Sequence, residues 1–124
     1  GRGGLSDVEW LVQLLQLQHA PEHQELRTTS TIAGLNALGQ AELLPEEDVQ
    51  DLQEAWILAT RIRAGIVIWS AKPSDVLPTN REDLEALARW CGYPAGHASD
   101  FEEDYLRITR IARGIFEHHF YGIT

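Results

Sequence analysis

Apolar residues recur at helical spacing along most of this chain, and the longest of these runs constrains the fold most. Between residues 49 and 69 they stand three or four positions apart, which predicts one helix of about seven turns. Pro45 and three acids occupy its first turn, and Pro73 ends it. Apart from residues 66–68, no segment shows the two-residue alternation of a half-buried strand. The sequence therefore predicts an all-α protein.

Four further helices are delimited by residues that commonly cap or end helices. A capping box at residues 6–9 opens a helix that runs to about residue 18, and hydroxyls at residues 28–31 open a short helix that ends near Gly39. Asn80 caps a helix that ends at Cys91, before Gly92, and a second capping box at residues 99–102 opens the last helix. Gly65, inside the long helix, predicts a close helix crossing. We expect a bundle of about five helices in a single domain, residues 1–124.

The first of these helices is apolar on most of its sides, which is typical of a central, buried helix. We therefore expect Trp10, Leu14 and Leu17 to lie in the core. On that interpretation Leu14→Ala costs about 2–5 kcal/mol of stability. By contrast, Glu103→Ala on the last helix changes it by about 0.5 kcal/mol or less.

The negative charge of the chain argues against some classes of binding partner. Its 10 Lys and Arg against 19 Asp and Glu give a net charge of −9, which argues against nucleic acid and against membrane surfaces. No apolar run approaches the roughly 20 residues that span a bilayer. A single cysteine, Cys91, offers no internal disulfide and indicates a reducing compartment, which we take to be the cytoplasm.

Few residue combinations predict chemistry, and each has a plain structural explanation. The glycines of residues 1–4 would either cradle a phosphate or, as a flexible turn, let the next helix pack closely, and a P-loop lysine and hydroxyl are missing. Pro21 separates His19 from His23, which spoils the common helical face that metal ligands need.

The remaining candidates are equally weak. Capping and solvation account for His97, Asp100 and Asp104, so we expect no metal site. We expect Cys91 to be an inert thiol in the core. The sequence contains no Gly-x-Ser-x-Gly motif, the turn that presents a catalytic serine. Taken from its residues alone, the chain is an acidic helical bundle that is not an enzyme by itself.

A resemblance to a known family rests on residues 3–13, which we call the signature. Gly3, Gly4, Asp7, Glu9 and Gln13 stand at the offsets of the signature of glutamine synthetase adenylyltransferases. The chain departs from that pattern at Val8 and Trp10, where the family has isoleucine and phenylalanine. The likeness continues through residues 15–20 and 26–29, and then as helical pattern over nearly all of the chain.

This resemblance implies an accessory role beside a separate active site. Members carry two nucleotidyltransferase domains, each followed by a helical domain with the signature. One half removes AMP from glutamine synthetase by phosphorolysis, and the other transfers AMP from ATP to one of its tyrosines. ATP and Mg²⁺ serve the chemistry, and glutamine and the PII signal protein set the balance. The catalytic aspartates belong to the nucleotidyltransferase domain, so we expect no catalytic residue here and no activity from the 124 residues alone.

The resemblance also implies a position within the larger enzyme. Ser6, Asp7 and residues 19–20 point to the helical domain of the C-terminal, adenylylating half. The lack of methionine and the glycine-rich start predict a piece cut from the C-terminal end of a multidomain protein. Two alternatives remain open. One is the corresponding helical domain of a PII uridylyltransferase, and the other is a free-standing helical interaction module without an enzymatic partner.

Asp7 is the signature residue that neither capping nor a close turn requires. Ser6 and Glu9 suffice for the capping box, and Gly3 and Gly4 for the turn. If a nucleotidyltransferase domain precedes Gly1, an acid here would orient an arginine of that domain or a water on its magnesium ion. Our hypothesis is that Asp7, with Glu9 as the weaker candidate, supports the active site, the alternative being a plain helix cap.

Overall fold

The computed structural model describes residues 5–19, 21–70 and 76–122, without the side chains of Leu5, Ser6, Trp69 and Ser70. It contains five α-helices and one 3₁₀ turn: α1 (Leu5–His19), η1 (Gln24–Leu26), α2 (Thr31–Gln40), α3 (Glu46–Ser70), α4 (Arg81–Trp90) and α5 (Ala98–Tyr121). The described residues include no strand. The all-α prediction is therefore confirmed.

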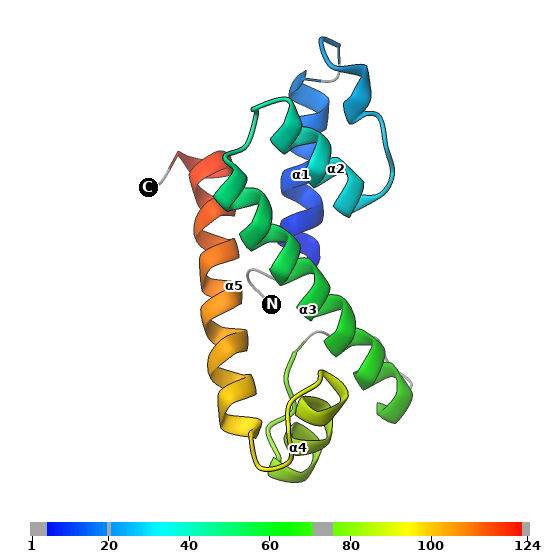
Figure 1. Cartoon of the computed structure of the whole chain (residues 1–124), viewed down its shortest axis with the longest axis vertical. Coiled ribbons are helices and arrows are strands. Elements are labelled where there is room, and N and C mark those ends of the chain that lie inside the picture. The colour runs from blue at the N-terminus through cyan, green and yellow to red at the C-terminus, as the bar shows by residue number, and fades with distance from the viewer. Residues whose placement is uncertain (1–4, 20, 71–75, 123–124) are drawn as a thin grey trace.

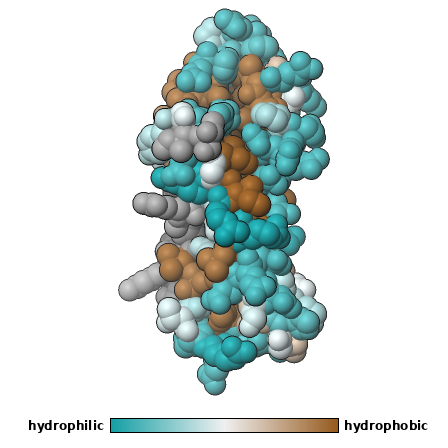
Figure 2. Space-filling model, turned by 90° about the vertical axis from the view of Figure 1, so that its left-hand side faces the viewer, coloured by the Kyte–Doolittle hydropathy of each residue, from teal (hydrophilic) through white to brown (hydrophobic). Residues whose placement is uncertain are grey.

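Two long helices, α3 and α5, organise the molecule (Figure 1). The start of α3 lies beside the end of α5, and the two helices then diverge. Near their meeting point α1 and α2 pack against them, while α4 fills the space where they separate. The result is an elongated bundle rather than one with parallel helices. On the face drawn in Figure 2 its surface is mostly hydrophilic, with separate hydrophobic areas.

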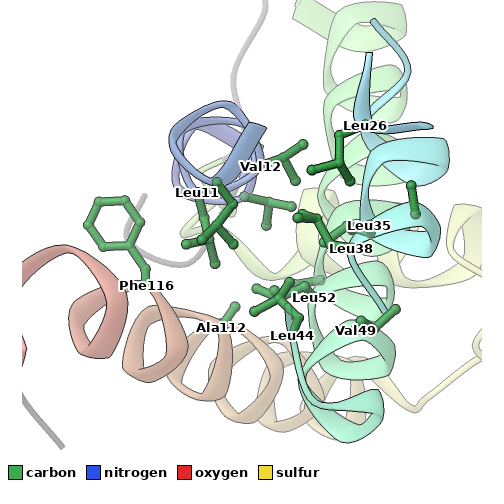
Figure 3. Packing of buried hydrophobic residues seen from close by; sticks show 14 of the residues in the cluster. Leu11, Val12, Leu26, Leu35, Leu38, Leu44, Val49, Leu52, Ala112 and Phe116 are labelled. Atoms are coloured by element: carbon green, nitrogen blue, oxygen red, sulfur yellow. The ribbon is translucent and has the colours of Figure 1, made fainter. Parts of the chain in front are cut away.

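Because the long helices diverge, the buried side chains form two clusters instead of one. The first cluster joins α1 and α2 to the first half of α3 and the second half of α5; Figure 3 shows Leu11 and Val12 of α1 facing Leu35 and Leu38 of α2. The second cluster joins α4 to the other halves of α3 and α5, around Phe101. The partly buried side chain of Leu58 packs against both clusters and connects them.

The predicted caps of α2 and α4 are confirmed. The Ser30 hydroxyl accepts a hydrogen bond from the amide of Ala33, and the Asn80 side chain accepts one from the amide of Asp83. In α5 the predicted capping box at residues 99–102 is wrong, because the helix already begins at Ala98, after His97. Ala98 is fully buried, so its packing draws the preceding residue into the helix start.

The other predicted boundaries are corrected, are confirmed or lie outside the described residues. α1 begins at Leu5, which places Ser6 inside its first turn rather than at the cap position. The predicted end of α2 near Gly39 is confirmed, because the helix ends at Gln40; the residue with left-handed backbone after it is Glu42, with φ of 59°. The predicted stop at Pro73 and the glycines at 1–4 fall on residues whose placement is not described.

The close crossing predicted at Gly65 is confirmed. A Cβ atom at this position would come within 2.8 Å of Leu87 Cδ1 and 2.9 Å of Trp90 Cδ1, both on α4. These distances are far below van der Waals contact between carbon atoms. Glycine is therefore what lets α4 approach the second half of α3.

The expected burial of α1 holds for only one of its sides. Val8, Leu11, Val12 and Leu15 lie in the first cluster. Trp10 is 60% exposed and Leu17 is 80% exposed, and Leu14 is only partly buried. The prediction that all three of these apolar residues lie in the core is wrong, because the neighbours of α1 cover a single face and leave the other to solvent.

Candidate functional site

The signature residues on α1 divide between the two edges of its exposed side. Asp7 and Glu9 are two residues apart, which turns their side chains about 200° from each other around the helix. Asp7 faces α5, whereas Glu9 and Gln13, four residues apart, face the start of α2. Trp10, Leu14 and Leu17 run between these edges; we call these three residues the outer stripe. Gly3 and Gly4 lie outside the described residues.

Asp7 makes an ion pair with an arginine from the other end of the fold. Arg113 Nη1 of α5 donates to both carboxylate oxygens of Asp7, at 3.3 Å each. Arg113 Nε also lies 3.3 Å from Glu117 Oε2, and its guanidinium carbon stands 4.7 Å from the centre of the Phe116 ring. The arrangement ties the first turn of α1 to the last third of α5.

The surroundings of Arg113 keep it charged. Burial is the largest single influence and lowers its pKa. The hydrogen bond and charge of Asp7, followed by those of Glu117, together raise the pKa by more than burial lowers it. The net result is a pKa above the ordinary value for arginine. The hypothesis drawn from the sequence is that Asp7 orients an arginine of a neighbouring domain or a water on its magnesium ion. In this structure Asp7 orients an arginine of its own chain.

The other edge of the outer stripe borders a small pocket of about 220 Å³. Glu9 and Gln13 line it from α1, and residues 28–31 line it from the segment that leads into α2. This segment is held in place by Gln16, whose Nε2 donates to the carbonyl oxygens of Leu26, at 2.8 Å, and Thr28, at 2.9 Å. The pocket offers one carboxylate, amides and hydroxyls, a set that binds polar groups by hydrogen bonds.

An open groove of about 570 Å³ continues from the pocket along the end of α1. It is lined by Gln13, Gln16, Leu17, Pro21 and residues 26–28. Together the outer stripe and this groove form the largest apolar part of the candidate site. A surface of this kind is typical of a contact with another protein surface.

The polar candidates named from the sequence lie away from this site. His97 Nδ1 is 2.7 Å from Asp100 Oδ2 at the start of α5. Asp104 does not join this pair; it accepts a hydrogen bond of 2.6 Å from the Tyr93 hydroxyl, in a cleft of about 510 Å³ between α3 and α5. Nowhere among the described residues do three His, Cys, Asp or Glu side chains come close enough together to hold a metal ion.

Two groups at this cleft, the Cys91 thiol and the Tyr93 hydroxyl, have raised pKa values. Burial, opposed in part by the charge of Arg61, raises the pKa of the Cys91 thiol to about 11. Burial, together with the hydrogen bond to Asp104, raises the pKa of Tyr93 to about 12. A thiol with so high a pKa is a poor nucleophile at neutral pH. The prediction that Cys91 lies buried in the core is confirmed.

Two residues of the site were not found from the sequence. Arg113 is separated from Asp7 by 106 positions, so no local pattern links them. Gln16 follows the apolar Leu15 inside a helix, and a polar residue beside the buried face was its only signal. Both residues act by holding backbone or helices in place.

The described helices include none that is long and apolar enough to cross a membrane. A family model described as GlnD PII-uridylyltransferase matches residues 1–120. The chain belongs to this family. The signature and nearly all of the bundle therefore fall inside the GlnD PII-uridylyltransferase domain.

Three relatives of the chain carry a different enzyme name. The chain is 50% identical over 122 residues to the bifunctional glutamine synthetase adenylyltransferase/adenylyl-removing enzyme of Leifsonia xyli subsp. xyli. The enzymes of the same name from Streptomyces avermitilis and Mycolicibacterium smegmatis are 49% and 46% identical. Each match covers 98% of this chain but only 12% of the relative. The resemblance to adenylyltransferases drawn from the signature is confirmed.

Proposed function

We propose that this chain is the helical domain that follows the adenylylating nucleotidyltransferase domain of a glutamine synthetase adenylyltransferase/adenylyl-removing enzyme. The observation that supports this most is the 50% identity to such an enzyme over 98% of the chain. The proposed whole enzyme transfers AMP from ATP to a tyrosine of glutamine synthetase. In that enzyme ATP and Mg²⁺ act in the nucleotidyltransferase domain, and the PII signal protein and glutamine regulate the transfer.

The role proposed for this domain is accessory and regulatory. What supports this role is the kind of groups on α1: they supply hydrogen-bonding side chains to a small pocket and an ion pair to α5. In this proposal the magnesium-dependent transfer belongs to the nucleotidyltransferase domain, and no magnesium-dependent step is assigned to the helical one. On this proposal the domain supports an active site that lies in another domain of the longer protein.

A second candidate is the helical domain of a PII uridylyltransferase. The description of the matching family favours it. The enzyme that contains it would transfer UMP from UTP to the PII protein. In that enzyme too the signature would stand at the start of the helical domain. The nucleotide and the acceptor protein separate the two candidates.

The test offers both substrates to the longer protein that contains this chain. ATP labelled in its α-phosphate, with magnesium and glutamine synthetase, should leave label on glutamine synthetase. Labelled UTP with PII protein serves as the control and should leave none. Label on PII alone would replace the first proposal with the second, and label transferred by the 124 residues alone would overturn the accessory role.

The support of the active site by Asp7 is a separate proposal with its own test. In the longer protein Asp7→Asn and Arg113→Met both break the ion pair, but only Asp7→Asn removes the carboxylate. We expect Asp7→Asn to lower AMP transfer by about tenfold or more, and Arg113→Met by about twofold or less, at a temperature at which both stay folded. Equal activities would leave Asp7 as the structural partner of Arg113. Glu9→Gln tests the weaker candidate in the same assay.

A further inference from the structure

Exposed apolar side chains gather where α4 crosses the second half of α3. Val67 is 40% exposed, Ile68 is 66% exposed and Trp90 is 48% exposed. Ala64, which shares the exposed side of α3 with the first two, is also exposed. We call these four residues the α3 patch. In Figure 1 this half of α3 leads away from α5, so the bundle leaves the patch open to solvent.

An arginine borders the α3 patch on each side of the helix. With 100° between successive residues, Val67, Ala64 and Ile68 span an arc of about 100° around α3. Arg63 stands about 40° beyond Val67, and Arg61 about 20° beyond Ile68. Both arginines are exposed, and no acid among the described residues forms an ion pair with them. The patch is therefore an apolar strip with a positive charge at either edge.

The charge of this part of the chain is opposite to that of the whole. Residues 55–70 contain no Asp or Glu, whereas the chain holds 19 of them against 10 Lys and Arg. Along α3 the acid nearest to Arg61 is Glu54, two turns or about 10 Å away. Along α4 the acid nearest to Trp90 is Glu85, whose carboxylate accepts a hydrogen bond from the amide of Gly96. At physiological ionic strength exposed charges more than about 8 Å apart are largely screened, so a partner at the patch interacts mainly with the arginines.

Trp90 is held in one orientation at the edge of the patch. Its Nε1 donates a hydrogen bond of 2.9 Å to the carbonyl oxygen of Arg61. The indole lies against the backbone of α3 at Gly65, where a Cβ atom would come within 2.9 Å of Trp90 Cδ1. Because the ring is already ordered, little conformational freedom is lost when a partner covers it. Tryptophan and arginine are also the residue types that contribute most to binding at protein interfaces.

We propose that the α3 patch, with Arg61 and Arg63, binds a short, acidic, amphipathic segment of another protein. Apolar side chains of that segment cover Ile68 and Trp90, and its carboxylates pair with the two arginines. A nucleic acid or an anionic membrane extends well beyond an area of this size and would meet the acids around it. A two-fold contact with a second copy would place like charges opposite each other. The inference does not depend on the proposed function.

The experiment measures how two fluorescent synthetic peptides bind to the longer protein that contains this chain. Both form amphipathic helices with leucines on one side, flanked by glutamates in the first peptide and by lysines in the second. We expect the glutamate peptide to bind about tenfold or more tightly than the lysine peptide. Its affinity should fall as the salt concentration rises from about 0.05 M to about 0.5 M. Equal affinities would overturn the proposal, and so would a lack of binding, which is the result if another part of the longer protein covers the patch.

Exposed residues offer matched variants that leave the buried clusters intact. Ile68→Glu and Arg63→Glu should each weaken binding of the glutamate peptide by about tenfold. Leu106→Glu and Arg110→Glu, at an exposed apolar and an exposed basic position of α5, should each change it by about twofold or less. Similar losses in the two sets would overturn the proposal, because the peptide would then bind wherever apolar and basic groups are exposed.

Two further measurements test the other occupants. Phosphatidylserine vesicles or duplex DNA should not bind at the patch, and binding of either that Arg63→Glu abolishes would overturn the proposal. Peptide binding that weakens as the concentration of the protein rises would show that a second copy covers the patch, which also overturns it. None of these measurements involves AMP transfer, so a failure of the proposed function would not change their outcome.

Discussion

At the scale of single residues, the ion pair between Asp7 and Arg113 joins the first helix of the bundle to the last. The side chains are 15% and 21% exposed, in the order Asp7 and Arg113. A pair this sheltered is screened less by solvent than a surface pair. Asp104 and Arg107 provide the comparison, since they pair at a similar distance of 3.4 Å with 39% and 51% of their side chains exposed.

We expect the sheltered pair to stabilise the fold and the exposed pair to add little. A double-mutant cycle with Asp7→Asn and Arg113→Met should give a coupling energy of about 1–2 kcal/mol in chemical denaturation. The matched cycle with Asp104→Asn and Arg107→Met should give about 0.5 kcal/mol or less. Equal coupling in the two cycles would show that shelter from solvent does not strengthen the Asp7–Arg113 pair.

His119 predicts a dependence of stability on pH. It is half-buried on α5, and its Nε2 has no hydrogen-bond partner among the described residues. Burial, with the charge of His118, lowers its pKa below the ordinary histidine value of 6.5, against the opposing charge of Asp48. Below about pH 6.5 the unfolded chain therefore binds a proton at this residue that the folded chain does not.

The free energy of unfolding should consequently fall as the pH is lowered through 6.5 towards the folded pKa. Replacing the imidazole by a ring that does not titrate, His119→Phe, should remove this part of the pH dependence. Denaturation midpoints measured between about pH 7.5 and 5.5 check it, since carboxylates titrate mostly below that range. Parallel curves for the variant and the original chain would contradict the assignment.

At the scale of helices, the glycines of α3 and α5 have opposite structural roles. Gly65 lies where α4 crosses α3, with no room for a Cβ atom, whereas a Cβ atom at Gly114 of α5 would meet nothing within 4 Å. Glycine within a helix costs stability relative to alanine unless close packing requires it. Gly65 meets that requirement and Gly114 does not.

Alanine substitutions at these two positions should therefore have opposite signs. Gly65→Ala should destabilise the fold by about 1–3 kcal/mol, because Leu87 and Trp90 have to move. Gly114→Ala should stabilise it by about 0.5–1 kcal/mol. Thermal unfolding of the two variants checks both, and a stabilised Gly65→Ala would mean that α4 yields at little cost.

Local sequence signals predict where helices form, but they predict less well which side of a helix the other helices cover. Ser30 and Asn80 were found as caps because a hydroxyl or amide side chain bonds to a backbone amide three residues away. The start of α5 was missed because the burial of Ala98, a tertiary effect, placed the helix start ahead of Ser99. Likewise, an apolar residue such as Leu17 signals a helix, but its position along the chain does not tell which side the other helices cover.

The candidate site was predictable only in part, for the same reason. The signature pointed to Asp7, Glu9 and Gln13, and the structure places all three along the outer stripe. Their division between two edges depends on Arg113 and on residues 28–31, which are remote in sequence. Such contacts arise from the packing of whole helices and leave no local pattern.

At the scale of the whole molecule, two clusters of buried side chains share the long helices α3 and α5. α4 packs on the second half of α3 and the first half of α5, around Leu87 and Phe101. The first cluster surrounds Leu38 and Leu11 at the other end. Regions with separate sets of buried contacts commonly open as separate units.

We expect the two ends to differ in local stability when either core is weakened. Leu87→Ala, which costs about 2–5 kcal/mol, should accelerate amide hydrogen exchange in α4 more than in α1 and α2. Leu38→Ala should do the reverse. Hydrogen exchange followed by mass spectrometry gives both patterns, and equal acceleration of all helices in both variants would mean that the bundle unfolds as one unit.

The pairing of α1 with α5 has a consequence for the order in which the chain is made. A ribosome adds about 5–20 residues per second, and Arg113 follows Asp7 by 106 positions, so the partner of the first helix emerges roughly 5–20 s after it. During that interval Val8 and Leu11, which end up fully buried, have no α5 to cover them. Completion of this bundle therefore waits for its last helix, and the nascent first helix is the part that a chaperone would have to shield.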